Sequence, residues 1–150
     1  MTDLAMIWEG EDRAADLQLV DGDLAAEDGL RTAVILSLFT DRRARPDDVL
    51  PEADADRRGW WGDVAAASPD DQIGSRLWLL SREKRRAEVV ARAREYAEEA
   101  LAWLVRDSVA RFVKVEAEIT PQGWLGLGVV IERPGGPARQ RFDFVWRGLQ

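Results

Sequence analysis

The chain has 150 residues, of which 46% are hydrophobic and 33% charged, a composition typical of one folded domain and not of a disordered tail. Its 28 acidic residues outnumber 21 basic ones, and the net charge of −7 disfavours nucleic acid and anionic membranes as partners. Cysteine and histidine are both absent, which excludes disulfides, thiolate zinc sites, cysteine nucleophiles and Ser-His-Asp triads. We therefore expect a single domain over residues 1–150, without a metal or a cofactor.

The chain has no apolar run long enough to cross a bilayer. Its first residues, MTDLAMIWEGEDR, also lack the basic and then apolar layout of a signal peptide. We therefore expect a protein that is made in the cytoplasm and stays soluble there, with no membrane partner.

The first predicted elements are a hairpin arm and a helix. The segment from Asp16 to Ala25 alternates apolar and polar residues up to an Asp-Gly-Asp turn at residues 21–23, a pattern typical of a short strand or hairpin arm. From Asp28 the apolar period becomes helical, which predicts a helix that ends at Thr40.

The following segment, residues 41–71, is rich in Pro, Asp, Gly and Arg. Its apolar residues follow neither the helical period nor the alternation of a strand. Loops of this length are uncommon in compact domains unless they carry function. It contains RRGWWGD, with the adjacent tryptophans Trp60 and Trp61. Adjacent side chains of an extended loop cannot both point inward. We therefore expect one tryptophan to anchor the loop in the core, and the other to lie under Arg57 or Arg58 or to face a partner; a loop staple alone is the alternative.

A second helix is predicted to begin at residues 68–71. Ser-Pro-Asp-Asp supplies an N-cap hydroxyl, a proline for the first helical position and two acids for the positive end of the dipole. Its apolar stripe would consist of Ile73, Leu77 and Leu80. The basic residues from Arg82 to Arg86 leave two alternatives open: a break with a short turn near Ser81, or one bent, continuous helix.

The strongest periodicity predicts a long helix from Glu83 to Arg106. Its apolar rows would face the core, whereas Arg92 and Glu99 would face solvent. After Asp107 the period changes to two, which predicts strands at 113–119, 125–131 and 142–146, with turns at 121–123 and 134–137.

The predicted fold class is therefore α+β: an N-terminal strand or hairpin and helices packed on a C-terminal three-stranded antiparallel meander. We expect the long helix to cover the apolar face of the meander. The two edges of such a meander carry unpaired N–H and C=O groups, and an exposed edge is a template for another chain.

Three patterns that suggest chemistry have simpler interpretations. Gly123, Gly126 and Gly128 have the wrong order for a dinucleotide site and lie in a strand pattern, where we expect a helix to pack closely over them. With so many acids, some pair will meet the spacing of a glycosidase by chance. Glutamates interleave with the basic cluster at 82–86 and the arginines beyond it, which indicates a solvated or partner-facing helix surface.

Four stretches carry a resemblance to a known family. LFTDRRA (38–44), RRGWWGD (57–63), IGSRLWLLSREK (73–84) and YAEEALAWL (96–104) resemble, in order and spacing, the Mu-like phage baseplate family. The similarity covers nearly the whole chain. Members of this family are small wedge proteins of contractile tails, and they look related to a broader group of wedge proteins once described as lysozyme-like.

The resemblance implies a small α+β subunit of the virion tail baseplate, present in several copies in a ring. Such a subunit joins other wedge proteins on one side and offers strand edges to the first ring of sheath subunits on the other. The broader group carries a Glu-Pro-Arg loop motif after its first helix. Here TDRRARPDDVLP has Arg45 and Pro46 with no preceding glutamate, so the role of that motif is not transferred to this chain.

Residue type and motif match together predict a protein-interaction surface, because tryptophan and arginine are enriched at binding hot spots. Its predicted members are Arg42, Arg43, Arg57, Arg58, Trp60, Trp61, Asp63, Arg76 and Trp78. The first hypothesis is thus a structural protein without catalysis, in a phage tail or a bacteriocin-like particle. The alternative is a peptidoglycan-active hydrolase that uses an acidic pair, but no short motif places an acid beside apolar side chains.

Overall fold

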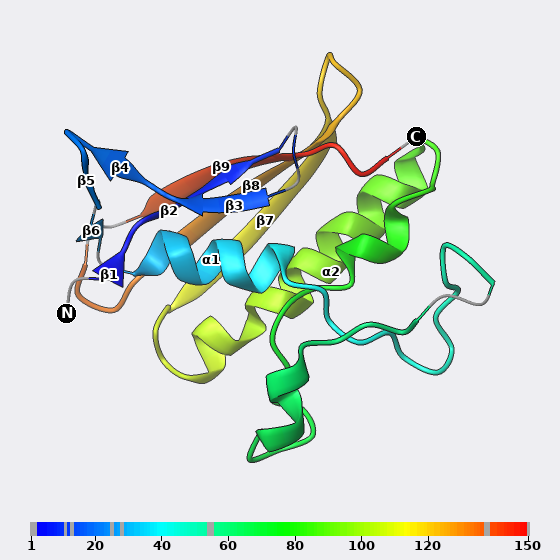
Figure 1. Cartoon of the computed structure of the whole chain (residues 1–150), viewed down its shortest axis with the longest axis horizontal. Helices are drawn as coiled ribbons and strands as arrows, with labels where there is room; N and C mark the ends of the chain where they lie inside the picture. Colours follow the sequence, from blue (N-terminus) through cyan, green and yellow to red (C-terminus); the bar gives the residue numbers. More distant parts are fainter. Residues whose placement is uncertain are drawn as a thin grey trace.

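The computed structural model describes residues 3–10, 12, 14–24, 26–27, 29–53, 56–136 and 139–149. In this part of the chain, small antiparallel pairs form the N-terminal region (Figure 1). They are β1 (Asp3–Leu4) with β6 (Ala26–Glu27), β2 (Met6–Glu9) with β3 (Ala14–Leu17), and β4 (Leu19–Val20) with β5 (Asp23–Leu24). The β4–β5 pair turns at Asp21 and Gly22, which confirms the predicted hairpin; Ala25, the last residue of that predicted segment, lies outside the described residues.

Helix α1 (Leu30–Phe39) confirms the first predicted helix. Asp28, where the helical period begins in the sequence, lies outside the described residues. The long helix α2 (Ala87–Arg106) is also confirmed, but it begins after Arg86, whose backbone is extended with φ −120° and ψ 155°. The chain therefore breaks between residues 81 and 86, as the first of the two alternatives had it. No helix within the described residues has both the length and the apolarity to span a membrane.

The helix predicted to begin at Ser68 is wrong. Residues 68–71 form a turn closed by a bond from Asp71 N to Ser68 O (3.0 Å), and a 3₁₀ segment, η2 (Leu77–Leu80), follows only later. Gly74 has φ +94° and lies against the carbonyl of Thr40, where a side chain would collide. All four residues of η2 are buried, so its leucines belong to a continuous apolar run and not to one stripe of a helix.

The C-terminal part is the predicted meander, with strands β7 (Phe112–Ile119), β8 (Leu125–Glu132) and β9 (Gln140–Trp146) in the order β7-β8-β9. Helix α2 packs on one face of the sheet, and α1 contacts both α2 and β2 (Figure 1). The core between them contains, among others, Leu101, Leu104, Val115, Leu125, Leu127, Val129, Ile131, Phe144 and Trp146. The predicted α+β class and the covering of the sheet by the long helix are confirmed.

The glycines of β8 lie on the other face of the sheet, so the expectation that a helix packs over them is wrong. The side chain of Arg141 passes over Gly128, where a Cβ atom would collide with its guanidinium. Arg141 donates to Glu116 (2.8 Å) and to Asp143 (2.9 Å), and Lys114 donates to Glu116 (2.8 Å). These bonds, that of Lys114 foremost, lower the pKa of Glu116 to about 2. This face of the sheet therefore carries a network of hydrogen-bonded basic and acidic side chains.

The two edges of the sheet differ. At β9, the indole Nε1 of Trp8 donates to Val145 O (2.7 Å), and the backbone of Gly10 lies against the same carbonyl. The Trp8 ring stacks on Phe39 at 3.7 Å between centroids, which fixes the β2–β3 pair beside β9. At β7, no strand of the described residues pairs with the outer edge. The N-terminal region thus covers part of one edge and leaves the other open.

Candidate protein-interaction site

The long loop between α1 and η2 starts and ends at the same place, the C-terminal end of α1. Asp41 and Ser75 form a parallel bridge, in which Arg42 N donates to Ser75 O and Ser75 N to Thr40 O, each at 2.9 Å. The hydroxyl of Ser75 donates to Leu38 O. Because Gly74 alone has the backbone freedom to turn here, this closure depends on a glycine inside a stretch whose pattern resembles a helix.

A buried arginine ties the loop to α2. Arg76 is 8% exposed, and its guanidinium pairs with Asp48 and with Glu99, each at 2.7 Å. It also lies over the ring of Tyr96, 4.5 Å from the centroid. One residue therefore joins the loop, through Asp48, to two positions on α2.

The carboxylate of Glu99 forms ion pairs with three arginines. Besides Arg76, its carboxylate pairs with Arg45 at 2.7 Å and lies 3.7 Å from Arg42. Its position in the heptad pattern predicts a solvent-facing residue, and that expectation is wrong. Nothing in its local sequence distinguishes it from the exposed Glu98 beside it, because the partners that half-bury it are far away in the sequence: Arg76 lies 23 residues earlier and Arg45 lies 54 residues earlier.

The tryptophan that lies under an arginine is Trp78, not one of the adjacent pair. Its Nε1 donates to Arg42 O (2.7 Å), and the guanidinium of Arg58 lies 4.4 Å from its ring centroid. Arg58 also pairs with Asp41 at 2.7 Å. It adopts a φ of +54° next to Gly59, so the backbone reverses sharply just before the tryptophan pair.

Trp60 and Trp61 are 42% and 82% exposed, so the expectation that one of them is anchored in the core is wrong. Their rings contact each other, with centroids 5.4 Å apart, and the short 3₁₀ segment η1 (Trp61–Ala65) follows. Val64 in the same segment is 94% exposed. The loop is thus fastened from inside by Arg76 and Trp78, and it presents its other tryptophans outward.

The remaining predicted residues brace the loop. Backbone N–H of Ala44 donates to Arg57 O (2.8 Å), and the Arg57 side chain donates to Arg45 O. Arg43 donates to Arg58 O at 3.3 Å. The structure therefore places eight of the nine predicted residues in the loop and the ninth, Trp78, in η2 directly after it. It buries Arg76 and Trp78, half-buries Arg42, Arg57 and Asp63, and leaves Arg43, Arg58, Trp60 and Trp61 exposed.

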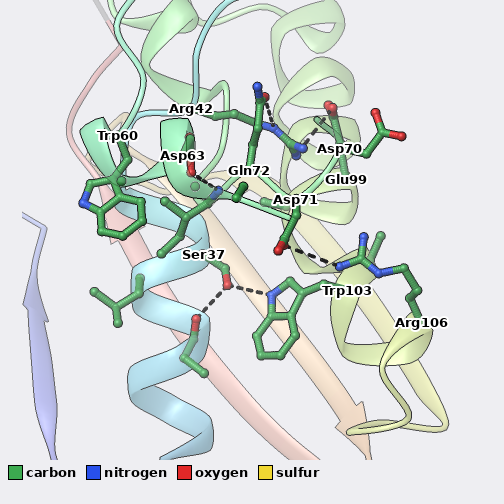
Figure 2. Close-up of a pocket in the computed structure, with 18 of the residues that line it drawn as sticks. Ser37, Arg42, Trp60, Asp63, Asp70, Asp71, Gln72, Glu99, Trp103 and Arg106 are labelled. Carbon is green, nitrogen blue, oxygen red and sulfur yellow. Dashed lines mark hydrogen bonds and ion pairs between the residues drawn. The ribbon is translucent and has the colours of Figure 1, made fainter. Parts of the chain in front are cut away.

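A cleft of about 460 Å³ lies between this loop, α1 and α2 (Figure 2). Asp63 lies in its wall, where Oδ1 accepts from the N–H of Ile73 (3.1 Å). Across the cleft, Trp103 Nε1 donates to the hydroxyl of Ser37 (3.0 Å), which in turn donates to Ala33 O (2.8 Å). No local pattern in the sequence predicts this cleft, because its walls come from three segments far apart in the chain.

We predict that Glu99→Gln lowers the free energy of unfolding by about 1–3 kcal/mol, because it leaves the buried Arg76 with one carboxylate instead of two and weakens the bonds to Arg45. Glu98→Gln on the same turn is the matched control and should change it by less than about 0.5 kcal/mol. Urea denaturation measures both. Equal values for the two variants would show that the carboxylate of Glu99 does not hold the loop.

The chain is similar to known proteins over most of its length. Residues 30–138 match the model of the family described as phage protein GP46. The chain is 48% identical over 136 residues to the baseplate protein gp46 of Escherichia phage Mu, covering 91% of this chain and 90% of that protein. It is 39% identical over 141 residues to the Mu-like prophage FluMu protein gp46 of Haemophilus influenzae, covering 94% of each. No solved structure matches. The resemblance seen in the sequence is confirmed: the chain belongs to the phage protein GP46 family.

Proposed function

We propose that the chain is a structural component of the baseplate of a phage or phage-like contractile tail, present there in several copies and acting through protein–protein contacts. The observation that carries this proposal is the 48% identity, over 91% of the chain, to a phage Mu protein named as a baseplate protein. The match extends over nearly the full length of both chains, and the family model covers residues 30–138, which include the long loop.

The alternative of a peptidoglycan hydrolase gains no support from the carboxylates of the cleft. A general acid in a glycosidase lies beside apolar side chains. Glu99 is instead surrounded by arginines, and Asp71 lies 4.0 Å from Arg106. Within the described residues, only Oδ1 of Asp63 accepts a bond, from the backbone of Ile73. Neither Glu99 nor Asp71 offers Asp63 a free carboxylate for an acidic pair, because arginines lie near both. We therefore propose a protein that acts without catalysis and without a cofactor.

We predict that a labelled antibody against this chain marks intact tail particles at the baseplate end, where the sheath begins. Electron microscopy of purified particles is the measurement, with an unrelated antibody on the same particles as the control. If the protein occurs only in the lysate and not in particles, the structural role is wrong, and a hydrolase or an assembly chaperone becomes the leading hypothesis.

The open edge of β7 is suited to strand addition. Thr120 N donates to Trp124 O (2.8 Å), one register step beyond the Ile119–Leu125 pair. Bonded and non-bonded pairs alternate in an antiparallel ladder, so the N–H and C=O groups of alternate residues point away from β8. These residues are Val113, Val115, Ala117 and Ile119. Their side chains pack on the core, which holds the edge rigid. We propose that a strand of a sheath subunit pairs with this edge.

We predict that Ala117→Pro folds but does not support sheathed tails, because it removes an outward N–H from an edge strand, where proline is tolerated. Electron microscopy of complemented particles gives the readout, and thermal unfolding checks the fold. Glu118→Pro is the contrasting variant and should destabilise the fold itself, since its N–H points toward β8. If Ala117→Pro is unstable, Val113→Pro repeats the test at another outward position. Normal sheaths with a folded variant would contradict strand addition.

The exposed side chains of the RRGWWGD loop suit a second contact. Trp61 and Val64 extend from a short 3₁₀ segment that is fixed by the bonded network behind it. Large apolar side chains held rigidly in solvent are typical of binding hot spots. We propose that this segment contacts another wedge protein, with Arg42, Arg43, Arg57, Arg58, Trp60 and Asp63 around it, and that Arg76 and Trp78 contribute by holding the loop.

We predict that Trp61→Ser changes the free energy of unfolding by less than about 0.5 kcal/mol, because the side chain is 82% exposed, yet reduces entry into particles at least tenfold. Tagged variant and wild-type chains are co-expressed, and their ratio in purified particles is measured. The control is Val49→Ser, because Val49 is an exposed apolar residue of the same loop that lies outside η1. Equal incorporation of Trp61→Ser and wild type would exclude a contact at Trp61.

A further inference from the structure

The cleft between α1, α2 and residues 60–74 has an apolar floor whose polar groups are already paired. Leu36 is 39% exposed, although the residues on both sides of it in α1 are buried. It shares the lining with Ile73 and with Trp103, and Figure 2 shows the Trp103 ring beside Ser37. The Trp103 N–H and the Ser37 hydroxyl bond to each other. The floor therefore suits apolar side chains better than a polar small molecule.

The rim of the cleft is acidic. The lining residues include the acids Asp63, Asp70, Asp71 and Glu99 against the bases Arg42 and Arg106, which leaves two more acids than bases. Glu99 is neutralised by arginines within the chain. Arg106 lies closer to Asp107 (3.0 Å) than to Asp71 (4.0 Å). Within the described residues, Asp70 has no ion pair.

The wall adds to this negative potential. The second carboxylate oxygen of Asp63 is buried and has no hydrogen-bond partner within the described residues. The Asp63 carboxylate therefore adds one negative charge to the acids that line the cleft. A basic partner is therefore attracted, whereas nucleic acid is repelled.

We infer that this cleft receives one face of an amphipathic helix from another protein, with apolar side chains on Leu36, Ile73 and Trp103 and lysine or arginine side chains on Asp70 and Asp71. A volume of about 460 Å³ admits several side chains from one helix face, as in other complexes of a helix in a groove. The inference rests on the proposed function only in taking that helix from a neighbouring baseplate protein.

Site-specific photocrosslinking in assembled particles tests the occupant. A benzophenone amino acid at position 36 should crosslink to a peptide of another baseplate protein that contains both apolar and basic residues, identified by mass spectrometry. The same probe at Glu95, which is exposed on α2 outside the cleft lining, should not yield that peptide. A crosslink to a second copy of this chain, or no crosslink from position 36 in particles that contain the chain, would overturn the inference.

Charge substitutions test the rim. Asp70→Lys combined with Asp71→Lys should reduce incorporation into particles at least tenfold, and Asp70→Asn with Asp71→Asn should reduce it less. Urea denaturation of the two double variants checks that each is folded. Full incorporation of the lysine variant would overturn the acidic-rim part of the inference. Failure of the wild-type chain to enter particles would instead refute the proposed function, so the two results are distinguishable.

Discussion

The ion-paired contact between Arg76 and Glu99 is the interaction on which the shape of the long loop depends. Within its described residues, the loop has no α-helix or strand and only the short 3₁₀ segment η1, so ordering its backbone carries a large entropic cost. Buried ion pairs offset their desolvation only when the geometry is good and the remaining polar groups are bonded. Arg76 meets that condition, because it bonds to two carboxylates and lies over an aromatic ring. The planar fork of arginine, unlike the ammonium of lysine, allows both contacts at once.

This arrangement reverses the usual distribution of residue types within the loop. An arginine and a tryptophan that would ordinarily serve a surface, Arg76 and Trp78, are buried and hold the loop from within. The adjacent tryptophans face solvent. A partner that contacts Trp61 therefore meets a surface that is already ordered, so less conformational entropy is lost on association. The internal network and the proposed external contact therefore share the same backbone segment.

The sequence predicts the regular elements well and the loop poorly, for a physical reason. Period and turn chemistry are local, and they identify α1, α2 and the three strands of the meander. The Ser-Pro-Asp-Asp signal at residues 68–71 is also local, but it is outweighed by the pairing of Ser75 with Asp41, far away in the sequence. The same holds for Glu99, whose partners come from the loop, and for Gly128, whose neighbour is Arg141 on the next strand and not a helix. At each of these positions, contacts with residues far away in the sequence determine the local structure or the burial of the side chain.

The position of the helices keeps the two proposed contact surfaces apart. Helix α2 has the sheet on one side, and the long loop extends from the helices away from the sheet (Figure 1). A strand added at β7 extends the sheet sideways and leaves the loop and its cleft uncovered. Since β7, α2 and the loop are linked by buried contacts, docking at one surface fixes the orientation of the others. If the proposed contacts at β7 and at the loop both form, this rigidity fixes the two partners relative to each other, which is the property that the proposed joining role requires.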